Sequence, residues 1–310
     1  MTAPTSDAPP SPAQSAKDHT LAGIALMLVG IFFFSVNDTM GKWLISTYSV
    51  GQVLLLRSIS AILILSPFIA RVGIGAFFRA PRPWLQVARA AFATFEVACF
   101  YWALSGMSLA DTMTFYLAGP IYVTAVSPFL LGEHVGWRRW MAVIAGFVGV
   151  MIALGPTGGA FSPHALVAIA GSLSFSIFMV CTRLVRGTSD VVLVGTQVIA
   201  ALIFGAVTAP FTWVPVSWFD AGLLALLGAV AMTAFLCINR SISLAPASVV
   251  VPYQYTSIVW AVLLGYIFFG DVPSRNVVIG AGIIIAAGFY IFIREQRRAK
   301  PPSFNEPPPA

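Results

Sequence analysis

Long runs of apolar residues dominate the chain, and charged residues hardly interrupt them. Ten runs can be drawn, each close to the roughly 20 residues that a helix needs to cross a hydrocarbon layer about 30 Å thick. Only 9% of the 310 residues are charged, and the mean hydropathy is +0.89. The sequence therefore predicts an all-α polytopic membrane protein with ten transmembrane helices. The predicted spans are 21–44, 50–70, 84–105, 108–131, 137–154, 163–183, 190–210, 218–237, 241–269 and 275–293.

The two ends of the chain differ from this apolar middle. Residues 1–19 are rich in Pro, Ser and Ala, which predicts a disordered cytoplasmic tail rather than a cleavable signal. Residues 294–310 are basic and then Pro-rich, which predicts a second cytoplasmic tail. We expect the core to be built from the segment between them.

Basic residues indicate how the spans are oriented. With the amino terminus inside, thirteen of the 17 Lys and Arg residues fall in inner segments, and only Lys42 and Arg275 fall in outer ones. Basic loops favour the cytoplasmic side of a membrane. The sequence therefore predicts that both termini are cytoplasmic.

The chain also repeats itself. "SLADTMTFYLAGPIYVTAVSPFLLGEHV" at 108–135 is echoed by "SLAPASVVVPYQYTSIVWAVLLGYIFFGDV" at 243–272. This spacing predicts two halves of five spans each, at 20–155 and 160–293. Because five is odd, the second half is inverted relative to the first. Inverted repeats are typical of secondary transporters, whose substrate site lies near the membrane midplane between the halves.

These features together resemble the drug/metabolite transporter superfamily, EamA type. The resemblance rests on the "ND…GK" end of the first span, an arginine in the second, "SLAD…P…LLGE", and "VVPYQYTSIVWAVLLGYIFFGD". It implies a ten-helix carrier of small organic solutes in a bacterial inner membrane. The chain is similar to bacterial members that take up riboflavin or S-adenosylmethionine. It departs from the family pattern in ending its second copy with Asp271 and in displacing the second proline.

Charged residues inside spans are costly and usually face a partner or a cavity. Asp38 lies about 9 Å from the outer end of the first span, and Arg57 lies about 10 Å into the second from the same side. The matching depth predicts that Asp38 and Arg57 are partners. The alternative is a pair between Asp38 and Lys42, which are four residues apart on one helix face.

Glu96 is predicted about 18 Å into the third span, close to the midplane, without an oppositely charged neighbour in sequence. A lone carboxylate there is a candidate for proton coupling or cation binding. The alternative is a structural ion pair with Arg57. For Arg89, we favour a side chain that reaches the inner interface over one that binds substrate.

Prolines and polar aromatic residues mark the fourth and ninth spans. Pro120 and Pro252 each remove a backbone hydrogen bond, so we expect both helices to bend there. Aromatic faces with polar tips suit a flat organic solute, although ordinary packing between helices explains the same residues. The candidates for substrate contact are Tyr116, Pro120, Asn239, Tyr253, Gln254 and Tyr255.

Several other residues are interpreted as structural. Ser108 and Asp111 fit a helix start in which the side chains satisfy free backbone N–H groups. Glu133 and Asp271 belong to turns after spans. The three cysteines are not arranged as metal ligands or redox pairs, so we expect no metal and no cofactor.

The sequence favours a transporter over the other classes of membrane protein. It lacks the nucleophile–base pair of an enzyme and the glycine-rich phosphate loop of an ATP-driven pump. We expect a small organic metabolite as substrate, protons as the coupling ion, and no nucleic-acid partner. Export instead of uptake, a membrane scaffold or enzyme, and a homodimer stay open.

Overall fold

A computed structural model describes residues 12–131, 136–154, 162–185, 187–244 and 250–299. Within these ranges the regular secondary structure is helical, as expected. The α-helices are α1 (Pro12–Ile45), α2 (Val50–Val72), α3 (Gly75–Phe78), α4 (Pro83–Leu104), α5 (Leu109–Leu117), α6 (Gly119–Leu131), α7 (Trp137–Leu154), α8 (Pro163–Leu184), α9 (Asp190–Thr208), α10 (Trp218–Leu244), α12 (Ser257–Phe269) and α13 (Arg275–Ala299). Two 3₁₀ segments, η1 (Ala209–Thr212) and η2 (Val251–Thr256), accompany them.

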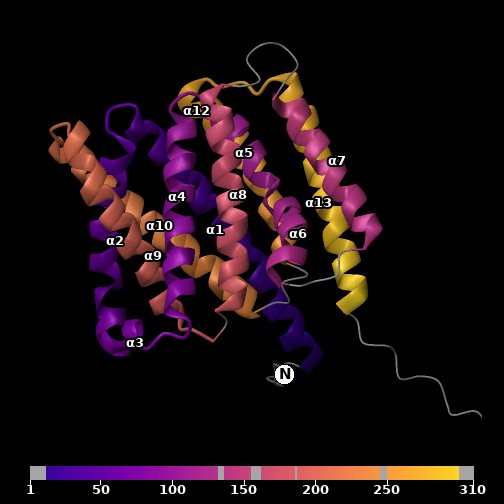
Figure 1. Ribbon diagram of the computed structural model, residues 1–310, viewed down its shortest axis with the longest axis horizontal. Coiled ribbons are helices and arrows are strands. Elements are labelled where there is room, and N and C mark those ends of the chain that lie inside the picture. Colours follow the sequence, from indigo (N-terminus) through magenta and orange to yellow (C-terminus); the bar gives the residue numbers. More distant parts are fainter. Residues whose placement is uncertain (1–11, 132–135, 155–161, 186, 245–249, 300–310) are drawn as a thin grey trace, which may run out of the picture.

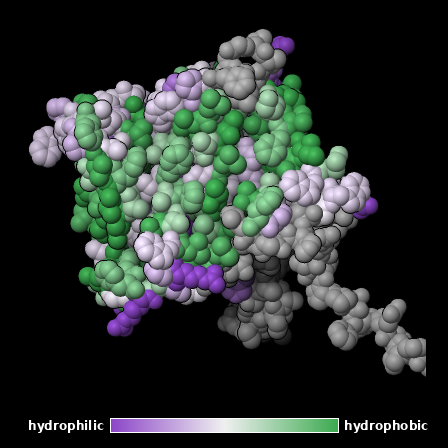
Figure 2. All heavy atoms as spheres, in the orientation of Figure 1, coloured by the Kyte–Doolittle hydropathy of each residue, from purple (hydrophilic) through white to green (hydrophobic). Residues whose placement is uncertain are grey.

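Seven of the described helices are long and apolar enough to cross a membrane: α1, α2, α4, α8, α9, α10 and α13. Two shorter apolar stretches, Trp140–Ala153 and Tyr253–Phe269, lie in α7 and in η2 with α12. Figure 2 shows hydrophobic side chains across the middle of one face, with hydrophilic ones at its rim. This confirms an all-helical polytopic membrane protein.

Some predicted boundaries were wrong. Helix α1 begins at Pro12, so residues 12–19 are helical rather than a disordered tail. Proline is favoured at the start of a helix, and the Ala, Gln and Lys residues that follow are good helix formers. Helix α13 continues to Ala299, past the expected end at 293. Residues 241–244 belong to α10, not to the ninth span.

Serine side chains begin several of the helices. Ser49, Ser108, Ser162 and Ser189 each accept a hydrogen bond from the backbone N–H three residues later. Such a cap satisfies one of the N–H groups that the first turn leaves free. In α5 the donor is the Asp111 N–H, at 3.0 Å, which confirms the predicted helix start there.

The helices form one bundle in which segments far apart in sequence lie side by side (Figure 1). Helix α1 packs against α10, α4 against α8, α2 against α9, and α7 against α13. Small residues allow this close approach in membranes. A Cβ on Gly205 of α9 would lie 2.5 Å from the backbone nitrogen of Leu55 in α2. One on Gly280 of α13 would lie 2.6 Å from the Gly149 carbonyl oxygen in α7.

The predicted bends in the fourth and ninth spans are confirmed as helix breaks. Helix α5 stops at Leu117 and α6 restarts at Gly119, so that Pro120 is the second residue of α6. In the other copy, Pro252 lies in η2, and α12 starts at Ser257. Helices α6 and α12 each contain 13 residues. Because proline donates no backbone hydrogen bond, each break falls where the α-helical ladder is weakened.

Candidate functional site

A cluster of polar side chains lies between the membrane-spanning helices α1, α2 and α4. Arg57 Nη1 donates a hydrogen bond of 2.7 Å to the hydroxyl of Tyr101, and the guanidinium lies 5.6 Å from the centre of that ring. Asp38 is buried and accepts a hydrogen bond of 3.1 Å from Asn37 Nδ2. The charge of Arg57 acts on both Asp38 and Glu96. The structure thus brings the three predicted charged residues near one another, with Arg57 hydrogen-bonded to Tyr101.

Glu96 faces the interior of the bundle. It shares one side of α4 with the buried residues Arg89, Ala93 and Phe100, whereas exposed Phe95 lies on another side. Glu96 is nevertheless only half-buried. Its helix face points toward the rest of the bundle, close to Ala93, Thr94 and Val97, which line the cavity described below.

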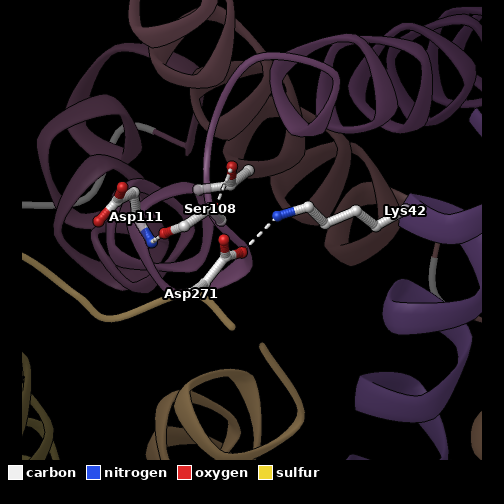
Figure 3. A network of polar contacts seen from close by, with 5 residues as sticks. Lys42, Ser108, Asp111 and Asp271 are labelled. Atoms are coloured by element: carbon white, nitrogen blue, oxygen red, sulfur yellow. Dashed lines mark hydrogen bonds and ion pairs between the residues drawn. The ribbon is translucent and has the colours of Figure 1, made fainter. Parts of the chain in front are cut away.

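Neither predicted ion pair of Asp38 is formed. Among the described residues the ion pair joins Lys42 Nζ to Asp271 Oδ2 at 2.5 Å (Figure 3). This pair connects the end of α1 to the turn after α12, and Lys42 also lies 4.6 Å from the centre of the Phe269 ring. Arg57 hydrogen-bonds Tyr101 instead of Asp38 or Glu96. The charges of Asp38 and Arg57 still influence each other, although the two side chains form no ion pair.

Asp111 lies beside the Lys42–Asp271 pair (Figure 3). The Asp111 carboxylate interacts electrostatically with Lys42 and Asp271. Its buried Oδ1 atom has no hydrogen-bond partner among the described residues. The four residues labelled in Figure 3 come from α1, the start of α5 and the turn after α12. This end of the bundle is therefore held by a contact between its first and last thirds.

Arg89 does not reach the inner interface as expected. Its side chain is 2% exposed, donates hydrogen bonds to the Leu193 carbonyl and to Thr196 Oγ1, and lies 5.5 Å from the centre of the Phe178 ring. Helices α8 and α9 pack against α4, and both supply contacts to this side chain. The prediction of an interfacial Arg89 was wrong, and the residue ties α4 to α9.

The predicted aromatic candidates lie in different surroundings. The Tyr116 hydroxyl donates a hydrogen bond of 3.1 Å to the Glu96 carbonyl, so Tyr116 adjoins the polar cluster. Tyr255 stacks on Phe289, with its hydroxyl against Gly288 of α13, and belongs to a separate apolar core. Tyr253 packs with an apolar group on α1.

The remaining candidates are less central. Pro120 and Gln254 are exposed on the surface of the bundle. The Asn239 side chain lies outside the described residues, as does the whole of Glu133. Of the sequence candidates, Asp38, Arg57, Glu96 and Tyr116 are brought together by the structure, and the others are not.

A small cavity of about 40 Å³ lies beside the cluster, between α2, α4, α9 and α10. Its polar lining residues are Arg57, Ser58, Thr94 and Gln197, and the other lining residues are apolar. The Thr94 hydroxyl is buried and has no partner among the described residues. A cavity of this volume holds a few water molecules or one small polar group.

The cavity walls from α2 and α9 have the same spacing. Leu54, Arg57, Ser58 and Ala61 line it from α2, and Val194, Gln197, Val198 and Ala201 line it from α9. Both sets follow the pattern i, i+3, i+4, i+7, and both start at the fifth residue after the serine that caps the helix. The cavity therefore lies between equivalent faces of the two helices.

Sequence reasoning missed Tyr101, Gly41 and the cavity. Tyr101 lies near the carboxyl end of α4, and a search that included uncharged polar side chains as partners of Arg57 would have considered it. A Cβ on Gly41 would lie 2.2 Å from Cε1 of Tyr101, which explains the glycine in the "NDTMGK" stretch. Thr94 and Gln197 carry no sequence signal that separates them from other polar residues in membrane helices.

Comparison with known proteins shows the family and the fold. The model of the EamA-like transporter family matches the chain twice, over residues 21–155 and 162–293. A solved crystal structure aligns over 92% of this chain and 99% of its own, with a TM-score of 0.56 and 19% identity, which shows a shared fold.

Three curated relatives illustrate the range of activities. The chain is 25% identical to an S-adenosylmethionine uptake transporter of Rickettsia prowazekii, over 89% of this chain and 94% of the relative. It is 25% identical to a riboflavin transporter of Vibrio cholerae, over 92% and 98%. It is 24% identical to a pseudopaline exporter of Pseudomonas aeruginosa, over 87% and 95%.

Proposed function

The chain belongs to the EamA-like transporter family, a family of transporters rather than enzymes, and on that premise we propose that it takes up a small organic metabolite across a bacterial inner membrane. The proposed mechanism is alternating access between two inverted five-helix halves, residues 20–155 and 160–293. In the proposed topology, ten spans place both termini in the cytoplasm. The excess of basic residues in the predicted inner segments supports this orientation.

The observation that carries the proposal is the cavity between equivalent faces of α2 and α9. In carriers built from inverted repeats, the substrate site lies near the midplane at the interface of the repeats. The packing pairs support this arrangement, because α1 on α10 is the counterpart of α8 on α4 when the halves are exchanged. The broken helices α5/α6 and η2/α12 add the interruptions that such carriers place near their substrates.

We propose Asp38, Arg57 and Glu96 as the residues that bind the solute or its coupling ion, with Tyr116 beside them. Asp38 and Glu96 are the candidates for proton coupling, because a carboxylate inside a membrane binds and releases protons as its surroundings wet and dry. Tyr253, Gln254, Tyr255, Pro120 and Asn239 remain weaker candidates for solute contact.

S-adenosylmethionine and riboflavin are the substrates to test first, because relatives carry these names. The purified protein in liposomes should accumulate one of them under a proton gradient and exchange it in counterflow. Rescue of a riboflavin auxotroph tests the second substrate in cells. Outward pumping by inverted membrane vesicles, without uptake, would favour export instead, as the pseudopaline exporter relative suggests.

A further inference from the structure

The cavity between α2, α4, α9 and α10 has a lining rich in hydrogen-bond donors. Arg57 has five N–H donors, of which one bonds Tyr101. Among the described residues, the side chains of Ser58 and Gln197 have no hydrogen-bond partner, and the Thr94 hydroxyl has none either. Unpaired polar groups inside a membrane protein are costly. The cavity is therefore built to receive a polar group that accepts hydrogen bonds.

The charge of the lining residues indicates which kind of hydrogen-bond acceptor the cavity binds. Arg57 is the cation of the cavity, and no described carboxylate lines it. Asp38 and Glu96 lie near Arg57 but outside the lining. A guanidinium with two hydroxyls and an amide matches the two oxygens of a carboxylate, which accept several hydrogen bonds. Water alone would satisfy the hydroxyls, whereas a bound carboxylate would also place an opposite charge against the guanidinium inside the cavity.

We propose that this cavity is the subsite for a carboxylate of the transported solute, held by Arg57, Ser58, Thr94 and Gln197. The inference rests on the proposed transport function and specifies its substrate class. A solute that also carries a cationic group would find the carboxylates of Asp38 and Glu96 near Arg57, outside the cavity lining. The substrate class is therefore a metabolite with both a carboxylate and a cationic group.

Two probes that differ by one carboxylate test the subsite: S-adenosylmethionine and its decarboxylated form. Binding of each is measured on the purified protein, together with competition for uptake into liposomes. We expect S-adenosylmethionine to bind at least about tenfold more tightly than its decarboxylated form, because the decarboxylated form lacks the charge-assisted hydrogen bonds to Arg57. Thr94→Val removes the buried hydroxyl at nearly constant volume and should reduce that ratio to about twofold.

A matched control and a second variant show whether the effect is specific to the cavity. Thr182→Val makes the same change in α8, where the hydroxyl bonds the Phe178 carbonyl away from the cavity, and it should keep the wild-type ratio. If Thr94→Val does not fold, Gln197→Met carries the same expectation from the opposite wall.

The outcomes separate the subsite from the transport function. Equal binding of the two probes to the wild-type protein overturns the subsite, as does a ratio that neither variant changes. Riboflavin uptake without competition from S-adenosylmethionine also overturns the subsite but leaves the transport function standing. Folded, reconstituted protein that moves no probe overturns the transport function itself.

Discussion

The α2 and α9 walls of the cavity have the same spacing of lining residues but differ in the chemistry of their side chains. On α2 the residues at the second and third positions of the pattern are Arg57 and Ser58, and on α9 they are Gln197 and Val198. Duplication of a helix preserves which positions point inward, because the helical period fixes the face. Duplication does not preserve the side chains, so one of two equivalent helices can carry the charged residue while the other carries a neutral one.

The same difference extends to α4 and α10. Ala93 and Val97 line the cavity from α4, and Gly228 and Met232 line it from α10 with the same spacing. Glu96 comes three residues after Ala93, and the equivalent residue after Gly228 is the apolar Ala231. The charged chemistry that we assign to transport therefore lies in the first half, and the second half supplies the matching surface.

Making the α2 wall like the α9 wall should cause the largest loss of transport. Arg57→Gln copies the α9 residue onto α2 and removes the cation of the cluster, together with its hydrogen bond to Tyr101. Loss of charged hydrogen bonds of about 1.5–3 kcal/mol each should reduce counterflow exchange about 100-fold. Exchange is measured in liposomes at equal amounts of inserted protein.

The exchanged pair sharpens this comparison. If the walls are equivalent, Arg57→Gln combined with Gln197→Arg places the cation on the opposite side of the same cavity. We expect the double variant to recover part of the lost exchange, whereas Gln197→Arg alone adds a second buried cation and impairs it. A double variant no better than Arg57→Gln would show that the cation must stay beside Tyr101.

Neutralising Glu96 should cause the next largest effect. Glu96→Gln keeps the shape of the side chain and removes its titration. The α4 face then resembles the α10 face, which carries no charge. Accumulation driven by a pH gradient should fall about tenfold, while counterflow stays within about twofold, because exchange needs no net proton movement. Both activities are measured in the same vesicles.

Two other results would contradict a coupling role for Glu96. Normal accumulation under a proton gradient would transfer the role to Asp38. A parallel fall in both activities, with less folded protein in the membrane, would indicate a structural residue.

Gly41 offers a milder way to disturb the charged half. Gly41→Ala would place a methyl group 2.2 Å from the Tyr101 ring, so the ring that holds Arg57 must move. We expect transport to fall about fivefold, in line with overpacking costs of about 1 kcal/mol or more. Gly282→Ala in α13 is the matched control, because nothing lies within 4 Å of the added carbon and transport should not change. Equal activity of both variants would contradict the positioning of Arg57 by Tyr101.

The elements of the fold were predictable because each depends on local sequence. Apolar length located the seven long membrane helices, Ser108 marked one helix start, and Pro120 marked a break. Partners were harder to predict, because they depend on which helices meet. Arg89 was expected at the inner interface, yet α9 packs over it. The depth comparison considered only acids as partners of Arg57 and so missed Tyr101.

The smallest expected effect concerns the pair that joins the two halves at one end. Lys42 and Asp271 come from opposite halves of the chain, and their side chains are 14% and 26% exposed. Pairs that are partly open to solvent contribute about 1 kcal/mol or less, so Lys42→Met should lower the thermal midpoint of unfolding only slightly. Under the proposed alternating access its effect on transport should be larger than its effect on stability, because the contact would break each time that end of the carrier opened. Reversing both charges restores an attraction across the same gap, so Lys42→Asp with Asp271→Lys should transport better than either single reversal. If the double reversal is no better than the worse single one, the contact acts through its neighbours Phe269 and Asp111 rather than through the attraction between the two charges.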